Sequence, residues 1–272
     1  MKKHFPTILL VLILITGLSL LLYPSFSDWW NAQRQSRAIT GYAEAVAVMD
    51  QDRYAEIWDT AWDYNQSLLD RPNSFVLSEE RQAEYESLLN IDGYGIMGYI
   101  EIPAINVALP IYHGTDETVL QVAVGHLEWS SLPVGNGSSH CVLSGHRGLP
   151  SAKLFTDLDD LVVGDVFMLR VLDEVLTYQV DQILIVDPTE KDALLIKEGQ
   201  DLCTLVTCTP YGINTHRLLV RGHRIENQEE ATQVVVTANA VQIEPEIVAP
   251  ILALPLLLLV IIVWAWPTKK KK

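Results

Sequence analysis

The chain has 272 residues, of which 49% are hydrophobic, and its 34 acidic and 19 basic residues give a formal net charge of −15. This acidic balance argues against nucleic acid as a partner, because phosphate backbones attract basic surfaces. Only three cysteines occur, at positions 141, 203 and 208. A disulfide framework therefore cannot replace an apolar core, and the odd count leaves at least one thiol unpaired.

The first apolar segment lies at the N-terminus. Two lysines precede a run of Leu, Ile and Val over residues 8–22, which is typical of a signal peptide or of a membrane span. No small-residue cleavage site follows this run, whereas Trp29 and Trp30 supply the amphipathic rings found at headgroup boundaries. We therefore predict an uncleaved transmembrane anchor over residues 1–24.

The last apolar segment gives the clearer pattern. Residues 247–266 contain no charged side chain and lead into four lysines at residues 269–272, which is a stop-transfer pattern. Twenty helical residues reach about 30 Å, enough to cross the hydrocarbon core of a bilayer. We predict a second transmembrane helix over residues 247–266 and a basic cytoplasmic tail over residues 267–272.

Basic residues at both ends predict that both termini are cytoplasmic, because positive charge is retained on that side of the membrane. The intervening residues 23–246 would then lie outside the cell. All 34 acidic residues fall within that segment. The sequence therefore predicts a multi-pass protein of the cell membrane with an extracellular central domain.

Residues 25–92 predict a helical extension ahead of the main domain. Apolar residues recur at helical spacing over residues 31–49 and again over residues 54–69. Ser78 is placed to begin a third, shorter helix that runs to about residue 89. We expect the extension either to pack on the main domain or to form a stalk from the membrane.

From Gly98 the hydrophobic period changes to alternation, which predicts a mainly β domain over residues 93–226, followed by a linker over residues 227–246. Short strands at close intervals with few helices indicate a closed or nearly closed barrel. The strands are expected at 99–102, 106–111, 140–144, 166–171, 176–186, 202–208 and 217–224, and short helices at 117–124 and 151–158.

The stretch from Thr204 to Gly222 has the pattern of a strand, a loop and a second strand. A proline, a glycine and an asparagine form the loop, so Cys208 closes the first strand and Arg217 opens the second. A thiolate beside a fixed cation suits acyl transfer, because the cation can lower the thiol pKa or hold an oxyanion. By itself, however, a cysteine on a strand is more often a small buried hydrophobe than a nucleophile.

A cysteine nucleophile also needs a group that protonates the leaving amine, and His146 is the candidate. Glycines near it on both sides let the backbone turn sharply and leave the imidazole at a rim. His216, beside Arg217, is its first competitor. His4 is predicted to be cytoplasmic, and the other four histidines are expected to be structural.

The remaining two cysteines are not predicted to be catalytic. Cys203 is five residues before Cys208, so a regular strand would put the two side chains on opposite faces, and no disulfide is expected between them. A pairing of Cys141 with Cys203 stays open. Neither a CxxC nor an HxxxH spacing is present, so no metal and no cofactor are expected.

Three parts of the sequence resemble the sortase family, and most of all its class C, the pilus-assembly sortases of Gram-positive bacteria. They are Thr204 to Gly222, Ser144 to Pro150 and Tyr99 to Pro103, within a likeness over roughly residues 93–225. The resemblance implies an eight-stranded sortase-type β-barrel with short helices, an N-terminal helical extension and a transmembrane helix at each end.

The resemblance also implies a cysteine transpeptidase for pilin or surface proteins that carry an LPxTG-like sorting signal. Cys208 would attack the carbonyl after Thr and form a thioacyl-enzyme, His146 would protonate the departing amine, and Arg217 would stabilise the oxyanion. Thr207, in the Thr-Leu-x-Thr-Cys pattern, would bind substrate. The acceptor in class C is a lysine side chain of the next pilin, which gives an isopeptide-linked polymer.

One departure from the class concerns the lid. Class C enzymes usually carry an Asp-Pro-aromatic motif ahead of the barrel that covers the active site. Here Asp70 and Phe75 are spread over the segment 70–75, so they would not make the usual contacts in the usual register. A lid built on Asp70 and Phe75 and a plain interhelical loop are the two alternatives.

Three other functions are weighed against pilus assembly. A housekeeping sortase would transfer surface proteins to a cell-wall peptide amine, but the C-terminal span argues against it. A papain-like protease would have its histidine after its cysteine. A non-catalytic scaffold for pilus assembly on the membrane would have a blocked or misplaced thiol.

Overall fold

The computed structural model describes residues 5–70, 75–91, 93–135 and 137–227. The chain divides into two units, which meet along the sequence between Trp30 and Asn31. The predicted second transmembrane helix, the basic tail and all of the predicted linker except its first residue lie outside the described residues.

The N-terminal apolar segment belongs to helix α1, which runs without interruption over Phe5–Ala47. Within the described residues, Pro6–Ala47 is the one helix that is long and apolar enough to cross a membrane. The predicted boundary near residue 24 does not coincide with a helix end. Pro24 lies inside α1, and no second proline follows it before Ala47, so the helix continues into the predicted extension.

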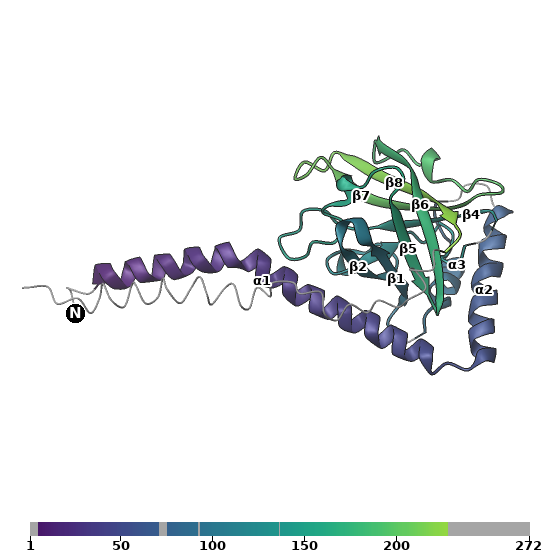
Figure 1. Cartoon of the computed structure of the whole chain (residues 1–272), viewed down its shortest axis with the longest axis horizontal. Coiled ribbons are helices and arrows are strands. Elements are labelled where there is room, and N and C mark those ends of the chain that lie inside the picture. Colours follow the sequence, from purple (N-terminus) through teal and green to yellow (C-terminus); the bar gives the residue numbers. More distant parts are fainter. Residues whose placement is uncertain (1–4, 71–74, 92, 136, 228–272) are drawn as a thin grey trace, which may run out of the picture. The chain divides into compact units, whose positions relative to one another are not determined.

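The described residues from Ile96 onward contain eight strands that form a closed barrel (Figure 1). The strand order around the barrel is β1-β2-β3-β4-β7-β8-β6-β5, and β2–β3 and β4–β7 are the parallel pairs. The strands are β1 (Ile96–Ile102), β2 (Val107–His113), β3 (Val124–His126), β4 (Ser139–Ser144), β5 (Val166–Val171), β6 (Glu174–Val186), β7 (Asp201–Thr209) and β8 (His216–Ile225).

The predicted mainly β barrel is confirmed, with two local corrections. The helix expected at 117–124 is only α4 (Glu117–Leu120), and the missed strand β3 follows it. β3 has three residues, too few to show an alternating pattern. No α-helix spans the described residues 151–158, where the chain turns back so that the Phe155 amide donates to the His146 carbonyl. Short 3-10 helices are η1 (Pro103–Ile105), η2 (Leu158–Asp160) and η3 (Asp192–Leu194).

The extension packs on the barrel through α2 (Gln51–Leu69) and α3 (Glu79–Ser87). Ala61 and Tyr64 of α2 and Tyr85 of α3 belong to the same buried cluster as the barrel interior. The Asn65 side chain is fully buried and forms two hydrogen bonds with the Leu132 backbone, of 3.0 and 2.7 Å. The expectation that the extension packs on the domain is therefore correct for these two helices.

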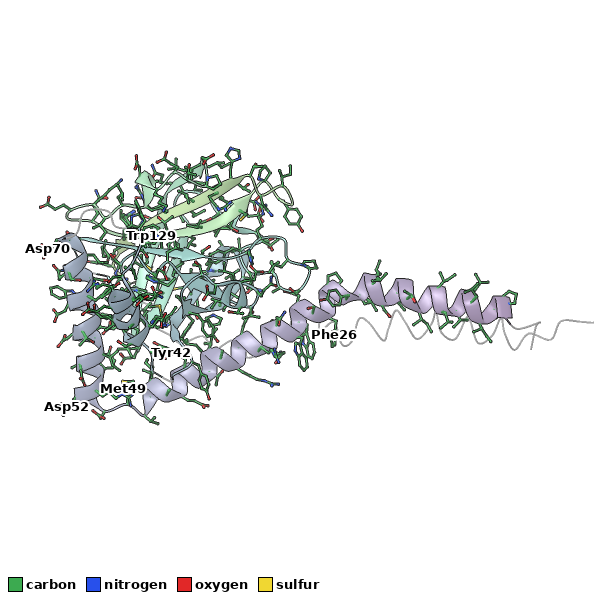
Figure 2. The ribbon with its side chains drawn as sticks, turned by 180° about the vertical axis from the view of Figure 1, so that it is seen from behind. Phe26, Tyr42, Met49, Asp52, Asp70 and Trp129 are labelled. Carbon is green, nitrogen blue, oxygen red and sulfur yellow. The ribbon has the colours of Figure 1, made fainter. Side chains whose placement is uncertain are left out.

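The C-terminal part of α1 contacts the barrel, and Tyr42 makes two buried hydrogen bonds there. The Tyr42 hydroxyl donates to the Met97 carbonyl at 2.9 Å and accepts from the Leu172 amide at 2.7 Å. Figure 2 marks Tyr42, with Asp52 and Asp70 at opposite ends of α2. Because each bond joins residues far apart in sequence, Tyr42 ties α1 to both β1 and the turn after β5.

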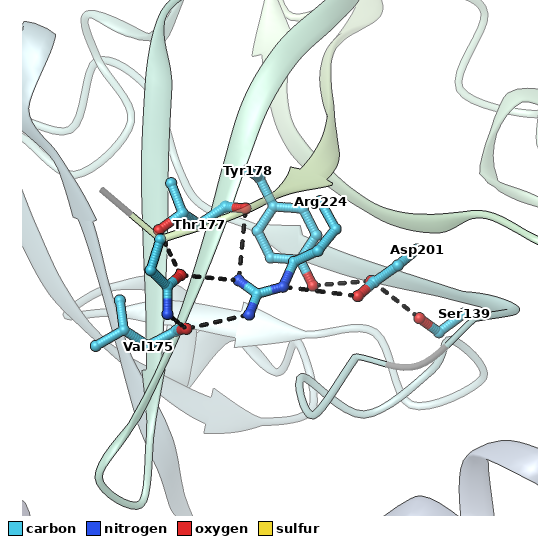
Figure 3. Close-up of polar contacts among 7 residues, drawn as sticks. Ser139, Val175, Thr177, Tyr178, Asp201 and Arg224 are labelled. Carbon is cyan, nitrogen blue, oxygen red and sulfur yellow. Dashed lines mark hydrogen bonds and ion pairs between the residues drawn. The ribbon is translucent and has the colours of Figure 1, made fainter. Parts of the chain in front are cut away.

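A polar network closes the barrel at the start of β7 (Figure 3). The Asp201 carboxylate accepts hydrogen bonds from the Tyr178 hydroxyl at 3.0 Å and from the Ser139 hydroxyl at 3.1 Å, and the Arg224 guanidinium lies 4.0 Å away. Arg224 also donates to the Val175 carbonyl at 3.2 Å. The network thus joins β4, β6, β7 and β8 at the end of β7 opposite to Cys208.

Alternation along β7 separates an inner from an outer face. Cys203 and Leu205 belong to the interior cluster, whereas Val206 belongs to an outer cluster with Val142, Leu194 and Leu219. Because side chains on a strand alternate between faces, Cys208 lies on the same outer face as Val206.

His140 is one of the histidines expected to be structural, and it gives a testable pH dependence. Its Nδ1 lies 2.9 Å from the Leu195 carbonyl and its Nε2 lies 2.7 Å from the Thr204 hydroxyl, so a neutral ring is bonded at both nitrogens. Burial lowers the pKa of His140 to about 4, although the bond to Leu195 opposes this shift. The unfolded chain, with a histidine pKa of about 6.5, therefore binds a proton first as the pH falls.

We predict that the free energy of unfolding falls between about pH 6.5 and pH 4, with His140 contributing roughly 2–3 kcal/mol of the loss. Urea unfolding of the detergent-solubilised chain, followed by tryptophan fluorescence, measures it. The loss should be smaller in His140→Gln, whereas the matched control His216→Gln, at an exposed position, should behave as wild type. Equal losses in wild type and His140→Gln would contradict the assignment.

Candidate active site

Three neighbouring strands bring the predicted catalytic residues into one row. Cys208 on β7 pairs directly with Arg217 on β8 in the antiparallel register. On the other side of β7, Ser144 of β4 pairs with Val206 in a parallel register, and the Gly145 amide donates to the Val206 carbonyl at 3.1 Å. Continued by two residues beyond the end of β4, that register would bring His146 level with Cys208. We refer to His146, Cys208 and Arg217 as the row.

Adjacent strands lie about 4.8 Å apart, and residues in one row of a sheet share a face. The order across the row is therefore imidazole, thiol and guanidinium. Cys208 is a free, partly exposed thiol, and the His146 side chain is 27% exposed, so a peptide can reach both. Such a row can supply a nucleophile, a proton carrier and a cation to one acyl group.

Arg217 is positioned by the loop between β7 and β8. Its Nη1 donates to the His216 carbonyl at 3.1 Å and to the Asn214 carbonyl at 3.4 Å. Hydrogen bonds from Thr189 are the main cause of a lowered pKa at Asp187, and the positive charge of Arg217 acts in the same direction. The guanidinium of Arg217 is therefore partly exposed and lies on the outer face of the barrel, in the row with Cys208.

The strand end below the row is fixed from inside the barrel. The buried Thr207 hydroxyl donates to the Gly145 carbonyl at 2.8 Å, which ties β7 to the residue before His146. A Cβ on Gly145 would lie 2.6 Å from the Phe155 ring. Gly145 is thus required for close packing, whereas the sequence suggested only a sharp turn.

Gly148, after His146, does adopt the left-handed conformation expected of a turn, with φ of +74°. The Tyr211 ring lies over it, 2.8 Å from the position of a Cβ. Arg147 places its guanidinium 5.7 Å from the centre of the same ring and pairs with Asp159. The loop after β4 therefore packs against the loop after β7, next to the row.

Glu117 was not predicted from the sequence. One oxygen of its carboxylate lies 3.7 Å from His146 Nε2, and the other accepts a hydrogen bond from Gln121 on the same short helix. The Glu117 side chain is 72% exposed. α4 lies in the parallel connection from β2 to β3, and β3 is the strand next to β4. This connection is the only signal that could have predicted the position of Glu117.

A cleft of about 690 Å³ with a mixed polar and apolar lining borders the outer cluster. Trp129 and Leu194 line it and also belong to the outer cluster that contains Val206 and Leu219. These last two residues are buried, and each stands two positions from a member of the row.

Of the two residues predicted to form a lid, Phe75 lines this cleft. Asp70 caps the C-terminal end of α2. The Phe75 ring packs edge-on against Trp129 at 4.9 Å, and the Lys191 ammonium lies 4.3 Å from its centre. Residues 71–74 are outside the described part of the chain, so a working lid over Cys208 stays a prediction.

Other predicted residues are placed away from the chemistry. Thr207 remains a predicted substrate-binding residue, but its buried side chain leaves only its backbone for such a contact. His216, the competitor of His146, is exposed and pairs with Thr209 at the end of β7. Within the described residues, no group of three His, Cys, Asp or Glu side chains is arranged to hold a metal ion.

Known proteins provide an independent comparison. Residues 100–225 match the model of the sortase domain. Sortase D of Bacillus subtilis is 34% identical over 131 residues, which are 47% of this chain and 63% of that protein. The chain thus spans less than two thirds of the curated relatives that it matches.

Solved structures extend the likeness beyond the barrel. Sortase C1 of Streptococcus agalactiae shares 53% identity and a TM-score of 0.69, over 71% of this chain and 100% of that one. Sortase C of Streptococcus pneumoniae shares 44% identity and a TM-score of 0.62, over 70% and 97%. With this barrel and these neighbours, the chain belongs to the sortase family and groups with its class C members.

Proposed function

We propose that the chain is a cysteine transpeptidase that cleaves an LPxTG-like sorting signal and transfers it to a lysine amine of a pilin subunit. The observation that carries this proposal is the direct pairing of Cys208 with Arg217, with His146 two residues beyond the end of the adjacent strand β4. The family membership supports it, because the row lies within the matched domain.

In the first half-reaction, the Cys208 thiolate attacks the carbonyl carbon that follows the Thr of the signal. The carbonyl oxygen takes the electron pair, and Arg217 stabilises the resulting negative charge. When the C–N bond breaks, His146 gives its proton to the departing Gly amine. The product is a thioester between Cys208 and the Thr carbonyl, together with a free peptide that begins with Gly.

In the second half-reaction, an acceptor amine attacks the thioester. His146 removes a proton from this amine, Arg217 again stabilises the oxyanion, and Cys208 leaves as the thiolate. An amide bond replaces the thioester, so the enzyme returns to its starting state. A water molecule in place of the amine would give simple hydrolysis.

The pilin acceptor is the finer part of the proposal. Similar solved structures include a pneumococcal sortase C described for its pilin substrate specificity and a sortase C1 of GBS pilus island 1, at 44% and 43% identity. These likenesses favour a lysine of a pilin over a cell-wall peptide amine. Transfer to wall peptide by a housekeeping enzyme is the second candidate function.

The cleft offers a place for part of the proposed substrate. A sorting signal of this type has an apolar Leu-Pro portion ahead of the scissile bond, and the cleft lining includes the apolar side chains of Trp129 and Leu194. We infer that this portion contacts the apolar part of the lining. Burial of about 100 Å² of apolar area there would contribute roughly 2–3 kcal/mol to binding.

The proposed location is the outer face of the cell membrane. α1 includes a helix suited to span a bilayer, which would anchor the barrel near the site of export of its substrates. Two membrane spans with both termini cytoplasmic remain part of the proposal. The acidic net charge of −15 would favour lysine-rich acceptors.

We predict that Cys208→Ala abolishes formation of both the acyl-enzyme and the product, because alanine has no nucleophile. The full chain in detergent is incubated with an LPxTG-type peptide and a lysine-containing pilin fragment, and products are identified by mass spectrometry. Wild type should give a Cys208 adduct and an isopeptide-linked product. Turnover by Cys208→Ala would exclude this residue as the nucleophile.

The same experiment separates the alternatives. Transfer to a short wall-type peptide amine but not to the pilin lysine would move the assignment to wall anchoring. No adduct with any sorting signal would favour the non-catalytic scaffold. Pilin fragments with that lysine replaced by arginine serve as the matched control for the acceptor.

We predict that Glu117→Gln lowers kcat/KM about two- to fivefold, because an exposed carboxylate stabilises a nearby imidazolium by only about 0.5–1 kcal/mol. Peptide turnover measured by mass spectrometry gives kcat/KM for each variant. Glu117→Asp should restore part of the rate. A kcat/KM identical to wild type in Glu117→Gln would show that the carboxylate has no role.

We predict that Thr207→Val lowers the free energy of unfolding by about 1–2 kcal/mol and reduces turnover, because the Gly145 carbonyl loses its donor next to His146. Thr207→Ser keeps the hydroxyl and should retain most of both. Urea unfolding and peptide turnover are measured in parallel. Full activity of Thr207→Val would mean that this bond does not position His146.

A further inference from the structure

Two cysteines outside the catalytic row face each other inside the barrel. Cys141 on β4 and Cys203 on β7 are direct partners in the parallel register. Both belong to the interior cluster, with 2% and 0% exposure. Each thiol perturbs the pKa of the other, which agrees with this close placement.

We propose that Cys141 and Cys203 form a disulfide bond in the exported protein, which leaves Cys208 as the only free thiol. This inference rests on the extracellular placement in the proposed function, because disulfides persist in oxidising compartments. It does not depend on the transpeptidase chemistry.

The register meets the geometric requirement of the bond. Disulfide-bonded cysteines have Cα atoms 4.4–6.8 Å apart, and direct partners on adjacent strands are separated by about 4.8 Å. Both side chains point to the same side of the sheet, as their shared cluster shows. Cys208, on the outer face of β7, cannot reach either sulfur without a change of register.

The bond would close a large loop. About 60 residues separate the two cysteines, and they include β5 and β6. Cross-linking a loop of this size removes much conformational entropy from the unfolded chain. Because both sulfurs are buried once the barrel has closed, oxidation has to occur on the incompletely folded chain, and the folded barrel then shields the bond from reductants.

The oxidant is a protein dithiol oxidoreductase in its disulfide form. A thiolate of Cys141 attacks one sulfur of that disulfide and forms a mixed disulfide, releasing the other sulfur as a thiolate. The Cys203 thiolate then attacks the Cys141 sulfur and displaces the oxidoreductase. Two electrons and two protons pass to the oxidoreductase, which leaves as a dithiol.

The position of the bond gives it a consequence for the site. Cys141 and Cys203 each stand five residues before a member of the row, His146 and Cys208 respectively. A covalent link at this level fixes the β4–β7 register that places the imidazole beside the thiol. It also removes the two competing thiols from exchange with Cys208.

The test counts thiols in the full chain produced in an exporting Gram-positive host. Cells are quenched in acid, and the denatured protein is treated with N-ethylmaleimide and weighed by mass spectrometry. We expect one adduct in wild type and none in Cys208→Ala, rising to three and two after reduction. A digest without reduction should contain a linked Cys141–Cys203 peptide pair. Three adducts before reduction in wild type, or a link that involves Cys208, would overturn the proposal.

A stability measurement adds an independent readout. Reductant should lower the Tm of Cys208→Ala by about 5–15 °C, and it should leave the Tm of the matched Cys141→Val/Cys203→Val/Cys208→Ala variant unchanged. An equal shift in both would count against the bond. Neither of these two tests measures turnover. A protein that has the expected thiol count but is inactive in the peptide transfer assay would therefore reject the proposed function and leave the disulfide proposal standing.

Discussion

The parallel pairing of β4 with β7 is the constraint on which the rest of the structure depends. These strands are far apart in sequence, and a parallel pair requires a long crossover, which β5 and β6 provide. The pairing brings the end of β4 level with the end of β7, so the same register continued by two residues leads from Ser144 and Val206 to His146 and Cys208. The β7–β8 hairpin then adds Arg217 from the other side. The site is thus a product of register rather than of any single loop.

The two faces of β7 have different roles. Inward residues build the barrel core and, through Thr207, hold the backbone below the row. The outward residue Val206 packs in the outer cluster, which borders the cleft. The Asp201 network secures the opposite end of the strand to β4, β6 and β8. With one end fixed in this way, the register at the catalytic end has little freedom to slip.

Sequence reasoning succeeded where the signal is local. Alternation gave seven of the strands, and the turn residues between Cys208 and Arg217 gave the hairpin that pairs them. The sequence did not predict β3, because three residues carry no period, or Glu117, because its place beside His146 depends on a crossover. The sequence also did not show why residue 145 must be glycine, because the reason is the close approach of the Phe155 ring, ten residues further along the chain. Contacts between segments far apart in sequence were thus the part that pattern alone could not supply.

The contact of Gly148 with Tyr211 has a consequence for how related sequences can vary. A larger residue at 148 would collide with the ring and would also be strained at a positive φ, whereas a smaller residue at 211 would uncover the glycine and remove the partner of Arg147. The two positions belong to loops on different strands but share one packing space. Substitutions at positions 148 and 211 should therefore occur together in related sequences, and a change at only one of them should be selected against.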